Sequence, residues 1–267
     1  MDNQKVTINT LLEMKSRGEK ITMLTCYDFL MAVLLDSTGI DIILVGDSVG
    51  NVLLGYENTI PVTMEEMLHH CKTVTRGSKR ALVVGDMPFM SYQISMEEAV
   101  KNAGRFLKEA NVNAVKLEGG EEIIDIIKKL VGIGIPVMGH LGLTPQSINV
   151  FGGYGIRGSS GEESSKIIND AKKLEKAGVF AIVLEKIPSK LAEQITASLK
   201  IPTIGIGAGK YCDGQVLVTH DMLGLFEKFT PKFSKRYAEM AKEMRQCFKS
   251  YIDDVKNQKF PSEEHSY

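Results

Sequence analysis

The chain has 267 residues and a formal net charge of −1 at pH 7, with 43% hydrophobic and 24% charged residues. This length suffices for one large α/β domain, and the composition is that of an ordinary globular protein. The balanced charge offers no basic surface for nucleic acid, and no segment is apolar for long enough to cross a bilayer. The first residues lack the basic and apolar regions of a secretion signal, so we expect a cytoplasmic protein without nucleic-acid or membrane partners.

Eight short apolar runs recur along the chain and predict buried parallel strands, because most are continuous rather than alternating. Helical patterns separate the runs, and two pairs, Thr63 with Glu66 and Ser95 with Glu98, predict capping boxes at helix starts. The runs lie near residues 21–26, 41–46, 81–86, 114–118, 136–141, 180–185, 202–206 and 215–219.

Alternating β and α units in this number predict a single-domain (β/α)₈ TIM barrel over residues 1–267. An open doubly wound sheet is the alternative, since periodicity does not reveal closure. Residues 6–18 predict a short N-terminal helix that can cover the barrel floor. Residues 234–258 predict a long amphipathic C-terminal helix, whose apolar stripe can pack on its own domain or on another subunit.

Four of the predicted strands lead directly into an acidic residue: Asp47, Asp86, Glu118 and Glu185. Because the strand ends of a barrel open onto one face, we expect these carboxylates to converge. Buried like charges need pairing, hydrogen bonds or a cation, and oxygen donors suit a hard ion such as Mg²⁺. Each acid alone can equally cap a helix or pair with a lysine, but the four together favour an enzyme site.

Three other residues are candidates for the same site as these acids. Lys116 precedes Glu118 by two positions and shares its side of the strand, so it can bind a substrate carboxylate, offset the acids or form a structural ion pair. Ser48 can offer its hydroxyl to an anion or cap a helix. His140 ends the fifth predicted strand, where it can orient a substrate or serve as a core histidine.

Two glycine-rich segments follow predicted strands. Residues 151–161 are typical of a lid or of an ordinary mobile loop. Residues 205–209 follow the seventh predicted strand, where barrels often bind phosphate, but close strand-to-helix packing explains the glycines equally well.

A series of longer motifs runs from near residue 5 to the end of the chain, and their order resembles that of the ketopantoate hydroxymethyltransferase family. These motifs are long and specific: Val45–Ser48, Pro61–Thr63, Asp86–Phe89, Lys116–Gly120, Gly139–Gln146, Phe151–Gly153, Gly205–Gly209, Asp213–Gln215, Pro231–Phe233 and Glu263–Ser266.

The resemblance implies a (β/α)₈ barrel of the phosphoenolpyruvate/pyruvate superfamily that uses Mg²⁺. It implies transfer of a hydroxymethyl group from 5,10-methylenetetrahydrofolate to 3-methyl-2-oxobutanoate, which gives 2-dehydropantoate in the synthesis of pantothenate, the coenzyme A precursor. The expected partners are therefore a small 2-oxo acid and a folate. The resemblance also implies a homo-oligomer, often a decamer.

The family's site residues carry over by motif onto this sequence. The metal site matches Asp47, Asp86 and Glu118; the oxo-acid site matches Asp47, Ser48, Asp86 and Lys116; and the general base matches Glu185. Glu185 is also the acid that is left once the other three serve a metal. His140 is a possible supporting residue.

Two other functions remain open from the residues. One is a Mg²⁺-dependent 2-oxo-acid lyase or phosphonomutase on the same barrel, although the Lys-Lys-Cys-Gly-His lid motif of the isocitrate lyase relatives does not occur here. The other is a barrel that binds a small acid or acts as a scaffold without catalysis.

Overall fold

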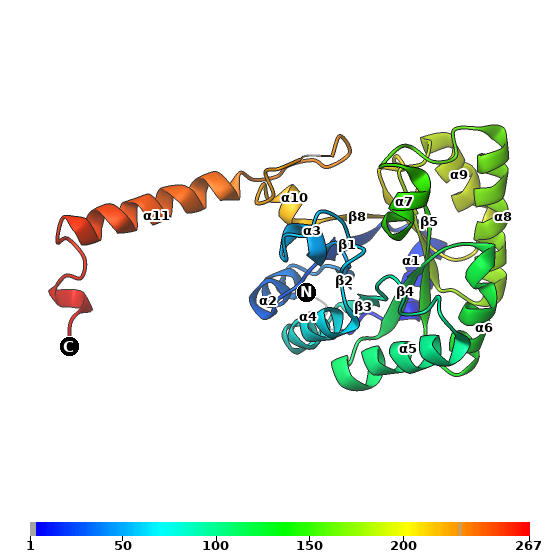
Figure 1. The fold of residues 1–267 in the computed structure, drawn as a ribbon, viewed down its shortest axis with the longest axis horizontal. Coiled ribbons are helices and arrows are strands. Elements are labelled where there is room, and N and C mark those ends of the chain that lie inside the picture. Colours follow the sequence, from blue (N-terminus) through cyan, green and yellow to red (C-terminus); the bar gives the residue numbers. More distant parts are fainter. Residues whose placement is uncertain (1–3, 230) are drawn as a thin grey trace. The chain divides into compact units, whose positions relative to one another are not determined.

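The computed structural model describes residues 4–229 and 231–267, and its central feature is a closed barrel of eight parallel strands (Figure 1). The strands pair in chain order, and β8 closes the ring on β1, with Met23 in register with Val216. Closure decides for the barrel and against the open sheet. Each strand overlaps one predicted run: β1 (Ile21–Thr25), β2 (Ile42–Val45), β3 (Leu82–Asp86), β4 (Ala114–Glu118), β5 (Val137–Gly142), β6 (Ala181–Glu185), β7 (Thr203–Ile206) and β8 (Gly214–Leu217).

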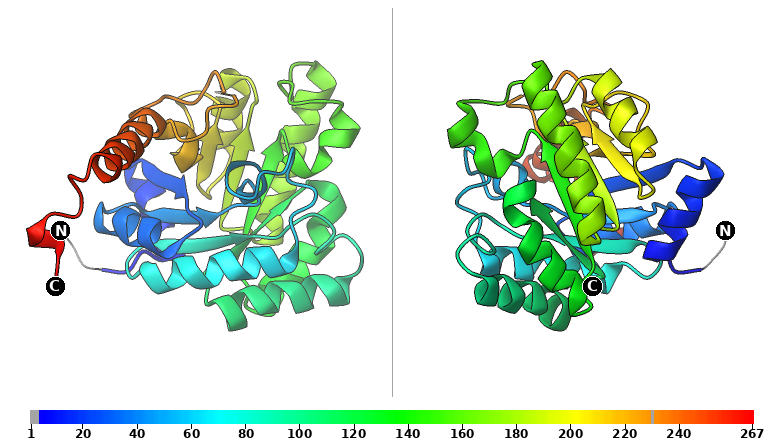
Figure 2. Two further views of the ribbon diagram at one scale, coloured as in Figure 1. Left: turned by 60° about the vertical axis from the view of Figure 1, so that its left-hand side comes forward. Right: turned by 90° about the vertical axis from the view of Figure 1, so that its right-hand side faces the viewer.

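Helices surround the barrel, as Figure 2 shows from two further directions. Thr63 and Glu66 form the predicted reciprocal capping box, whereas Ser95 accepts a bond from the Glu98 amide without the return bond. The helices between the strands are α2 (Phe29–Ser37), α3 (Val49–Val52), α4 (Met64–Gly77), α5 (Met96–Ala110), α6 (Ile124–Gly132), α7 (Ile148–Phe151), α8 (Gly161–Ala177) and α9 (Ser189–Ser198), with 3₁₀ turns η1 (Glu121–Ile123) and η2 (Pro145–Ser147).

The first helix, α1 (Ile8–Arg17), lies at the end of the barrel where the strands begin. The Lys15 ammonium donates to Asp213 at 2.7 Å, immediately before β8, and to the carbonyl of Thr196 at 3.2 Å. The Val6 amide donates to the carbonyl of Arg80 at 2.8 Å, just before β3. These contacts confirm that the N-terminal helix covers the floor.

The strands that lead to the acids are buried along their whole length. Every residue of β2, β3 and β4 is buried, and β6 is buried up to its final residue, Glu185. β1 and β8 instead alternate between buried and more exposed positions. The acids therefore stand at the ends of the barrel's best-covered strands, where a charged group needs partners.

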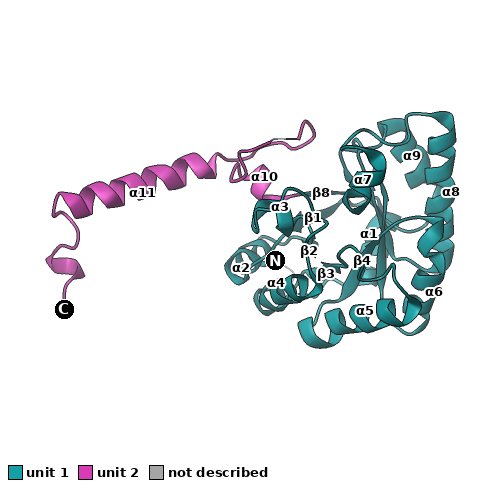
Figure 3. Cartoon of the chain, in the orientation of Figure 1, with its two compact units in different colours: residues 1–217 teal, residues 218–267 magenta. Residues whose placement is uncertain are grey.

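The chain divides into two compact units, residues 1–217 with the barrel and residues 218–267 (Figure 3). The second unit contains α10 (Thr219–Met222), α11 (Met240–Lys256) and the 3₁₀ turn η3 (Glu263–His265). α11 begins later than its predicted start at residue 234, because the Tyr237 and Met240 amides donate to the carbonyls of Met222 and Leu223. One domain over residues 1–267 thus stays a prediction.

The described helices of both units include none with the length and apolarity needed to traverse a bilayer.

Asp36 fastens the end of α2 to the segment before β3. Its carboxylate accepts the amides of Lys79, Arg80 and Ala81 at 2.7–3.1 Å and the Ser78 hydroxyl at 3.1 Å. Burial by itself raises the pKa of Asp36, but these hydrogen bonds outweigh burial and hold the pKa below its usual 3.8. Because the folded-state pKa is depressed, the stabilisation is present at neutral pH and disappears as the pH falls through that pKa.

We therefore expect Asp36→Asn to lower the free energy of unfolding at pH 7 by about 1.5–3 kcal/mol, the range for hydrogen bonds to a charged group. The difference in free energy of unfolding between the native protein and Asp36→Asn should become smaller as the pH falls below 3.8. Urea unfolding at several pH values measures this, with Asp125→Asn as a control. Asp125 is exposed, and its ion pair within the described part of the chain is with Lys128. A deficit that does not change with pH would contradict the assignment.

Candidate active site

The four strand-end acids come together at one mouth of the barrel. Asp47 follows β2, and its amide donates to the Asp86 carboxylate at 3.3 Å. Glu118 and Glu185 end β4 and β6, and the imidazole of His140 on β5 lies between them. The predicted convergence is therefore present in the structure, and it involves five consecutive strands.

Lys116 points inward and supplies a positive charge inside this cluster. Its Nζ atom lies 2.6 Å from Asp86 Oδ1 and 3.5 Å from Glu118 Oε1, and its side chain is only 4% exposed. Burial alone would lower the pKa of Lys116, but the surrounding carboxylates reverse this and raise it. The ammonium is thus retained at neutral pH and offsets the acids.

His140 bridges two of the acids. Its Nδ1 atom is 3.0 Å from Glu118 Oε1, and Nε2 is 3.3 Å from Glu185 Oε2, an ion-pair distance without hydrogen-bond geometry. Burial and the Lys116 charge lower the pKa of His140, whereas Glu118 and the contact with Glu185 raise it, and the net pKa is about 9. A protonated imidazole therefore faces both carboxylates at neutral pH.

Gln146 joins the two sides of the cluster, and sequence reasoning did not identify it. Its Nε2 donates to Asp47 Oδ2 and to the carbonyl of Met87, both at 2.9 Å. Its backbone amide donates to Glu118 Oε2 at 3.0 Å, and its Oε1 accepts the Tyr92 hydroxyl at 3.0 Å. One neutral residue in η2 thereby holds two acids, Asp47 through its side chain and Glu118 through its backbone amide.

Tyr92 is a second residue that the sequence did not point to. Its side chain is fully buried, and its hydroxyl accepts the Glu118 amide at 3.1 Å and lies 2.9 Å from the Glu118 carbonyl. The only sequence signal was that Gln146 belongs to the long motif around His140. Neither side chain carries a charge, so neither was conspicuous among the acids.

The Ser48 side chain does not cap a helix and contacts Tyr27 instead. It precedes the four-residue helix α3, and its side chain makes no capping bond there. Its Oγ instead lies 2.8 Å from the hydroxyl of Tyr27, a buried tyrosine that follows β1. The tyrosine thus orients the serine hydroxyl beside Asp47.

The charges of the cluster do not balance within the protein. Four carboxylates face two cationic groups, Lys116 and His140. Burial, Asp86 and Glu118 raise the pKa of Asp47 well above its usual range; burial and Glu118 raise that of Asp86 despite Lys116. Burial opposes ionisation of Glu118 as well, but Lys116 and His140 outweigh it and lower the pKa of Glu118. Ionisation is therefore disfavoured at Asp47 and Asp86, where a nearby cation would stabilise the charged forms.

These two aspartates have the donor chemistry that a divalent cation requires, since both are buried carboxylates with unbalanced charge. Glu118 differs, because Lys116 and His140 contact its Oε1 and the Gln146 amide contacts its Oε2. Within residues 4–229 and 231–267 no group of three or more His, Cys, Asp and Glu side chains is arranged as a metal site. The residues fit a cation held by Asp47 and Asp86, with Glu118 engaged elsewhere.

Gly142 sets the distance between β5 and the end of β6. It has φ = +94°, and a Cβ at this position would lie 2.2 Å from the carbonyl oxygen of Glu185. The next amide, of Leu143, donates to that same oxygen at 2.9 Å. Glycine is therefore required for the backbone of Glu185 to approach the end of β5 this closely.

The glycines at residues 205–209 are explained by close packing in this structure. A Cβ at Gly209 would lie 2.4 Å from the Ser189 hydroxyl, and one at Gly205 would lie 3.0 Å from Cys212 Sγ. The phosphate-binding alternative for this segment has no charged partner among these neighbours.

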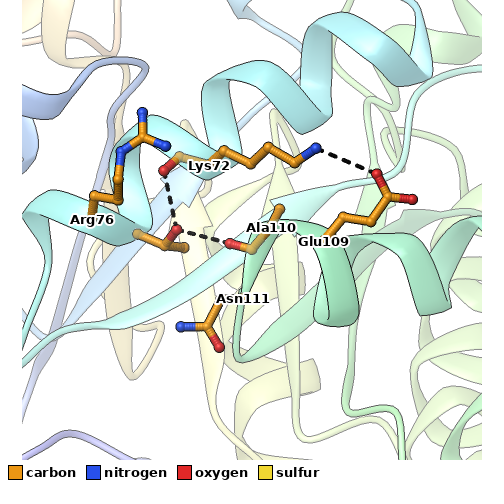
Figure 4. A pocket seen from close by; sticks show the side chains of 6 residues that line it. Lys72, Arg76, Glu109, Ala110 and Asn111 are labelled. Carbon is orange, nitrogen blue, oxygen red and sulfur yellow. Dashed lines mark hydrogen bonds and ion pairs between the residues drawn. The ribbon is translucent and has the colours of Figure 1, made fainter.

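A hollow of about 350 Å³ between α4 and α5 lies apart from the acids (Figure 4). Its lining includes the C-terminal residues of both helices, which lead toward the strand starts and not toward the mouth. Lys72 spans it to Glu109 at 3.4 Å, and the Thr75 hydroxyl donates to the carbonyl of Ala110 at 2.8 Å. These contacts pack two helices together and present no reactive set of groups.

A closed parallel barrel whose mouth holds buried acids, a lysine and a histidine defines the class of (β/α)₈-barrel enzymes. Solved structures share this fold. A phosphonopyruvate hydrolase complex with oxalate and Mg²⁺ has a TM-score of 0.65 at 12% identity, covering 97% of this chain and 93% of its own. A 2,3-dimethylmalate lyase of the PEP mutase/isocitrate lyase superfamily has a TM-score of 0.63 at 16% identity, covering 93% and 88%. At such identities the similarity concerns the fold alone.

The chain belongs to the ketopantoate hydroxymethyltransferase family, whose model matches residues 5–263. It is 57% identical over 264 residues to a 3-methyl-2-oxobutanoate hydroxymethyltransferase of Syntrophus aciditrophicus, covering 99% of this chain and 97% of the relative. It is 59% identical over 263 residues to the protein of that name from Caldicellulosiruptor saccharolyticus, covering 98% and 99%. The resemblance seen in the sequence is thus confirmed. The chain is a hydroxymethyltransferase, which removes the non-catalytic alternative.

The Gln146 contacts lead to a prediction. Gln146→Leu leaves Asp47, the Met87 carbonyl and the Tyr92 hydroxyl without their present partner. We expect kcat to fall about 10- to 100-fold, the usual effect of removing a residue that orients site ligands. Steady-state kinetics measures this, with Gln93→Leu as the control. Gln93 is exposed, and among the described residues it contacts Gln146 Oε1 at 3.3 Å and the Tyr92 amide at 3.4 Å but none of the four acids. Equal activity of the two variants would show that Gln146 orients nothing of importance.

Proposed function

We propose that this protein transfers a hydroxymethyl group from 5,10-methylenetetrahydrofolate to 3-methyl-2-oxobutanoate, giving 2-dehydropantoate for pantothenate synthesis. The observation that carries the proposal is the buried cluster in which Lys116 and His140 stand between acids of four different strands. The relatives named above support the choice of substrate.

The oxo acid is an anion, and the mouth offers it one binding side. Lys116 provides the positive charge for its carboxylate, and the Ser48 hydroxyl, held by Tyr27, provides a hydrogen-bond donor. Both lie beside Asp47 and Asp86. This arrangement supports Asp47, Ser48, Asp86 and Lys116 as the oxo-acid site.

We infer that Mg²⁺ belongs to this side of the cluster. Asp47 and Asp86 would hold it, because the charged forms of these two buried carboxylates need a cation beside them. Glu118 would support the site indirectly, through its contacts with Lys116 and with the Gln146 amide. When bound, the cation supplies positive charge beside the oxo group, where negative charge develops as the C3 proton leaves.

Glu185 is the proposed base that removes the C3 proton. Its side chain is 16% exposed, whereas those of Asp86, Glu118 and His140 are each 3% exposed. It is therefore more accessible than Asp86 and Glu118. The His140 imidazole lies 3.3 Å from its carboxylate, and general-base catalysis of this kind contributes about 10²- to 10⁴-fold. The resulting C3 nucleophile forms a carbon–carbon bond with the one-carbon unit of the folate. The bonds of that unit to the folate nitrogens break, water supplies the hydroxyl of the product, and tetrahydrofolate leaves.

Two further properties are part of the proposal. We infer that copies of the chain associate, because α2 exposes a group of apolar residues that a second copy would cover. The exposed apolar residues of α2 that a second copy would cover are Phe29, Leu30, Val33 and Leu34. Light scattering that found only monomer would exclude this.

We infer a cytoplasmic location, because all four cysteines are free, as a reducing compartment maintains them. Cell fractionation tests the location.

The proposed reaction has a direct test. Purified protein given 3-methyl-2-oxobutanoate and 5,10-methylenetetrahydrofolate should form 2-dehydropantoate, detected by mass spectrometry. Chelation with EDTA should abolish turnover and added Mg²⁺ should restore it, because the acids alone leave their negative charge unbalanced. Release of pyruvate or glyoxylate from other 2-oxo acids, without folate-dependent product, would instead identify a lyase.

The role of Glu185 can be tested apart from the folate. In deuterated buffer the native protein should exchange the C3 hydrogen of the oxo acid without any donor. Glu185→Gln should slow this exchange by about 10²-fold or more, since a neutral amide does not accept the proton. Glu193→Gln, at an exposed position on α9, is the matched control and should exchange normally. Unimpaired exchange in Glu185→Gln would remove the base assignment.

A further inference from the structure

The cluster is closed on one side and open on the other. The side chains of Lys116, Asp86, Glu118 and His140 are at most 4% exposed, while that of Glu185 is 16% exposed. An oxo acid bound at Lys116 and Asp86 therefore presents its reacting carbon toward Glu185. A second substrate that donates a one-carbon unit to this carbon has to approach from the Glu185 side.

The loop between α7 and α8 is attached to this open side. The Lys186 ammonium donates to the carbonyl of Tyr154, and the Arg157 amide donates to the carbonyl of Lys186 at 2.9 Å. Lys186 follows Glu185 directly and has φ = +46°, a conformation that non-glycine residues seldom adopt. The backbone of the loop is thus tied to the residue next to the proposed base.

Tyr154 is the aromatic residue that this attachment brings to the mouth. Burial raises the pKa of its phenol, and the charges of Glu185 and Asp47 raise it further, so the hydroxyl lies within electrostatic range of both. The residue as a whole is nevertheless 49% exposed. Its side chain is therefore near these two acids and leaves much of its surface open.

The ring of Tyr154 is available for a ligand, in contrast to its neighbour Phe151. The Arg157 guanidinium lies 4.0 Å from the centroid of the Phe151 ring and occupies one face of it. Among the described residues, no ring or cation contacts Tyr154 in this way. A half-exposed aromatic ring on an anchored loop is a ready surface for stacking.

We propose that Tyr154 is the donor-binding residue, against whose ring the flat aromatic part of the reduced folate stacks on the Glu185 side of the mouth. This inference rests on the proposed function, because it assumes that the second substrate is a folate. It assigns to the loop at residues 151–161 a specific task, which is to hold the donor where the carbon of the oxo acid can attack it.

The test separates the ring from the hydroxyl. Tyr154→Ala should raise KM for 5,10-methylenetetrahydrofolate about 3- to 10-fold, which corresponds to one aromatic pair, while KM for the oxo acid changes little. Tyr154→Phe keeps the ring and should retain the native donor KM. Tyr211→Ala is the control, because Tyr211 is a comparably exposed tyrosine on the loop after β7. It should leave the donor KM unchanged.

Several results would contradict the role of Tyr154 in donor binding. An unchanged donor KM in Tyr154→Ala, or an equal rise in Tyr154→Phe, would overturn the proposal, as would a rise confined to the oxo acid. Donor-free deuterium exchange at C3 reports whether each variant is folded and competent. If the native protein makes no folate-dependent product, the proposed function fails on its own. Calorimetric titration with tetrahydrofolate then still tests Tyr154, since Tyr154→Ala should bind it 3- to 10-fold more weakly, by about the contribution of one aromatic pair.

Discussion

The site depends on the concentration of four carboxylates at the buried end of a parallel barrel. Such groups remain ionised in the interior only where positive charge or hydrogen-bond donors surround them. Lys116 and His140 together outweigh burial at Glu118, whose pKa is lowered. At Asp47 and Asp86 the charge of Lys116 does not outweigh burial and the neighbouring acids, and the pKa values of both are raised. The mouth therefore has two parts. Around Glu118 the protein's own cationic groups stabilise the carboxylate, and at Asp47 and Asp86 a bound cation would do so.

Much of the fold was predictable, because its determinants are local. Continuous apolar runs indicated the buried strands, and the Thr63–Glu66 box marked the start of α4. The acids were predictable for the same reason, since each directly follows or ends a strand. Closure of the ring was not, because the pairing of β1 with β8 joins segments at the two extremes of the barrel sequence.

Gln146 and Tyr92 escaped prediction for a different physical reason. Their importance comes from three-dimensional contacts: Gln146 reaches Asp47 across 99 positions of sequence, and Tyr92 reaches Glu118 across 26. A neutral polar side chain gives no charge pattern to read. The start of α11 was likewise set by backbone bonds to α10 that periodicity does not encode. Resemblance to a family supplied roles for the charged residues but not for these supports.

The reactive groups all come from the consecutive strands β2 to β6, whereas β7, β8 and β1 complete the ring. This asymmetry has an evolutionary consequence. The connection after β7, residues 207–213, carries none of the acids or of the supporting contacts named above, so its length can change with less effect on the cluster as lineages diverge. The connections after β2 to β6 have no such freedom, and drift in loop length should be strongly disfavoured in that part of the chain.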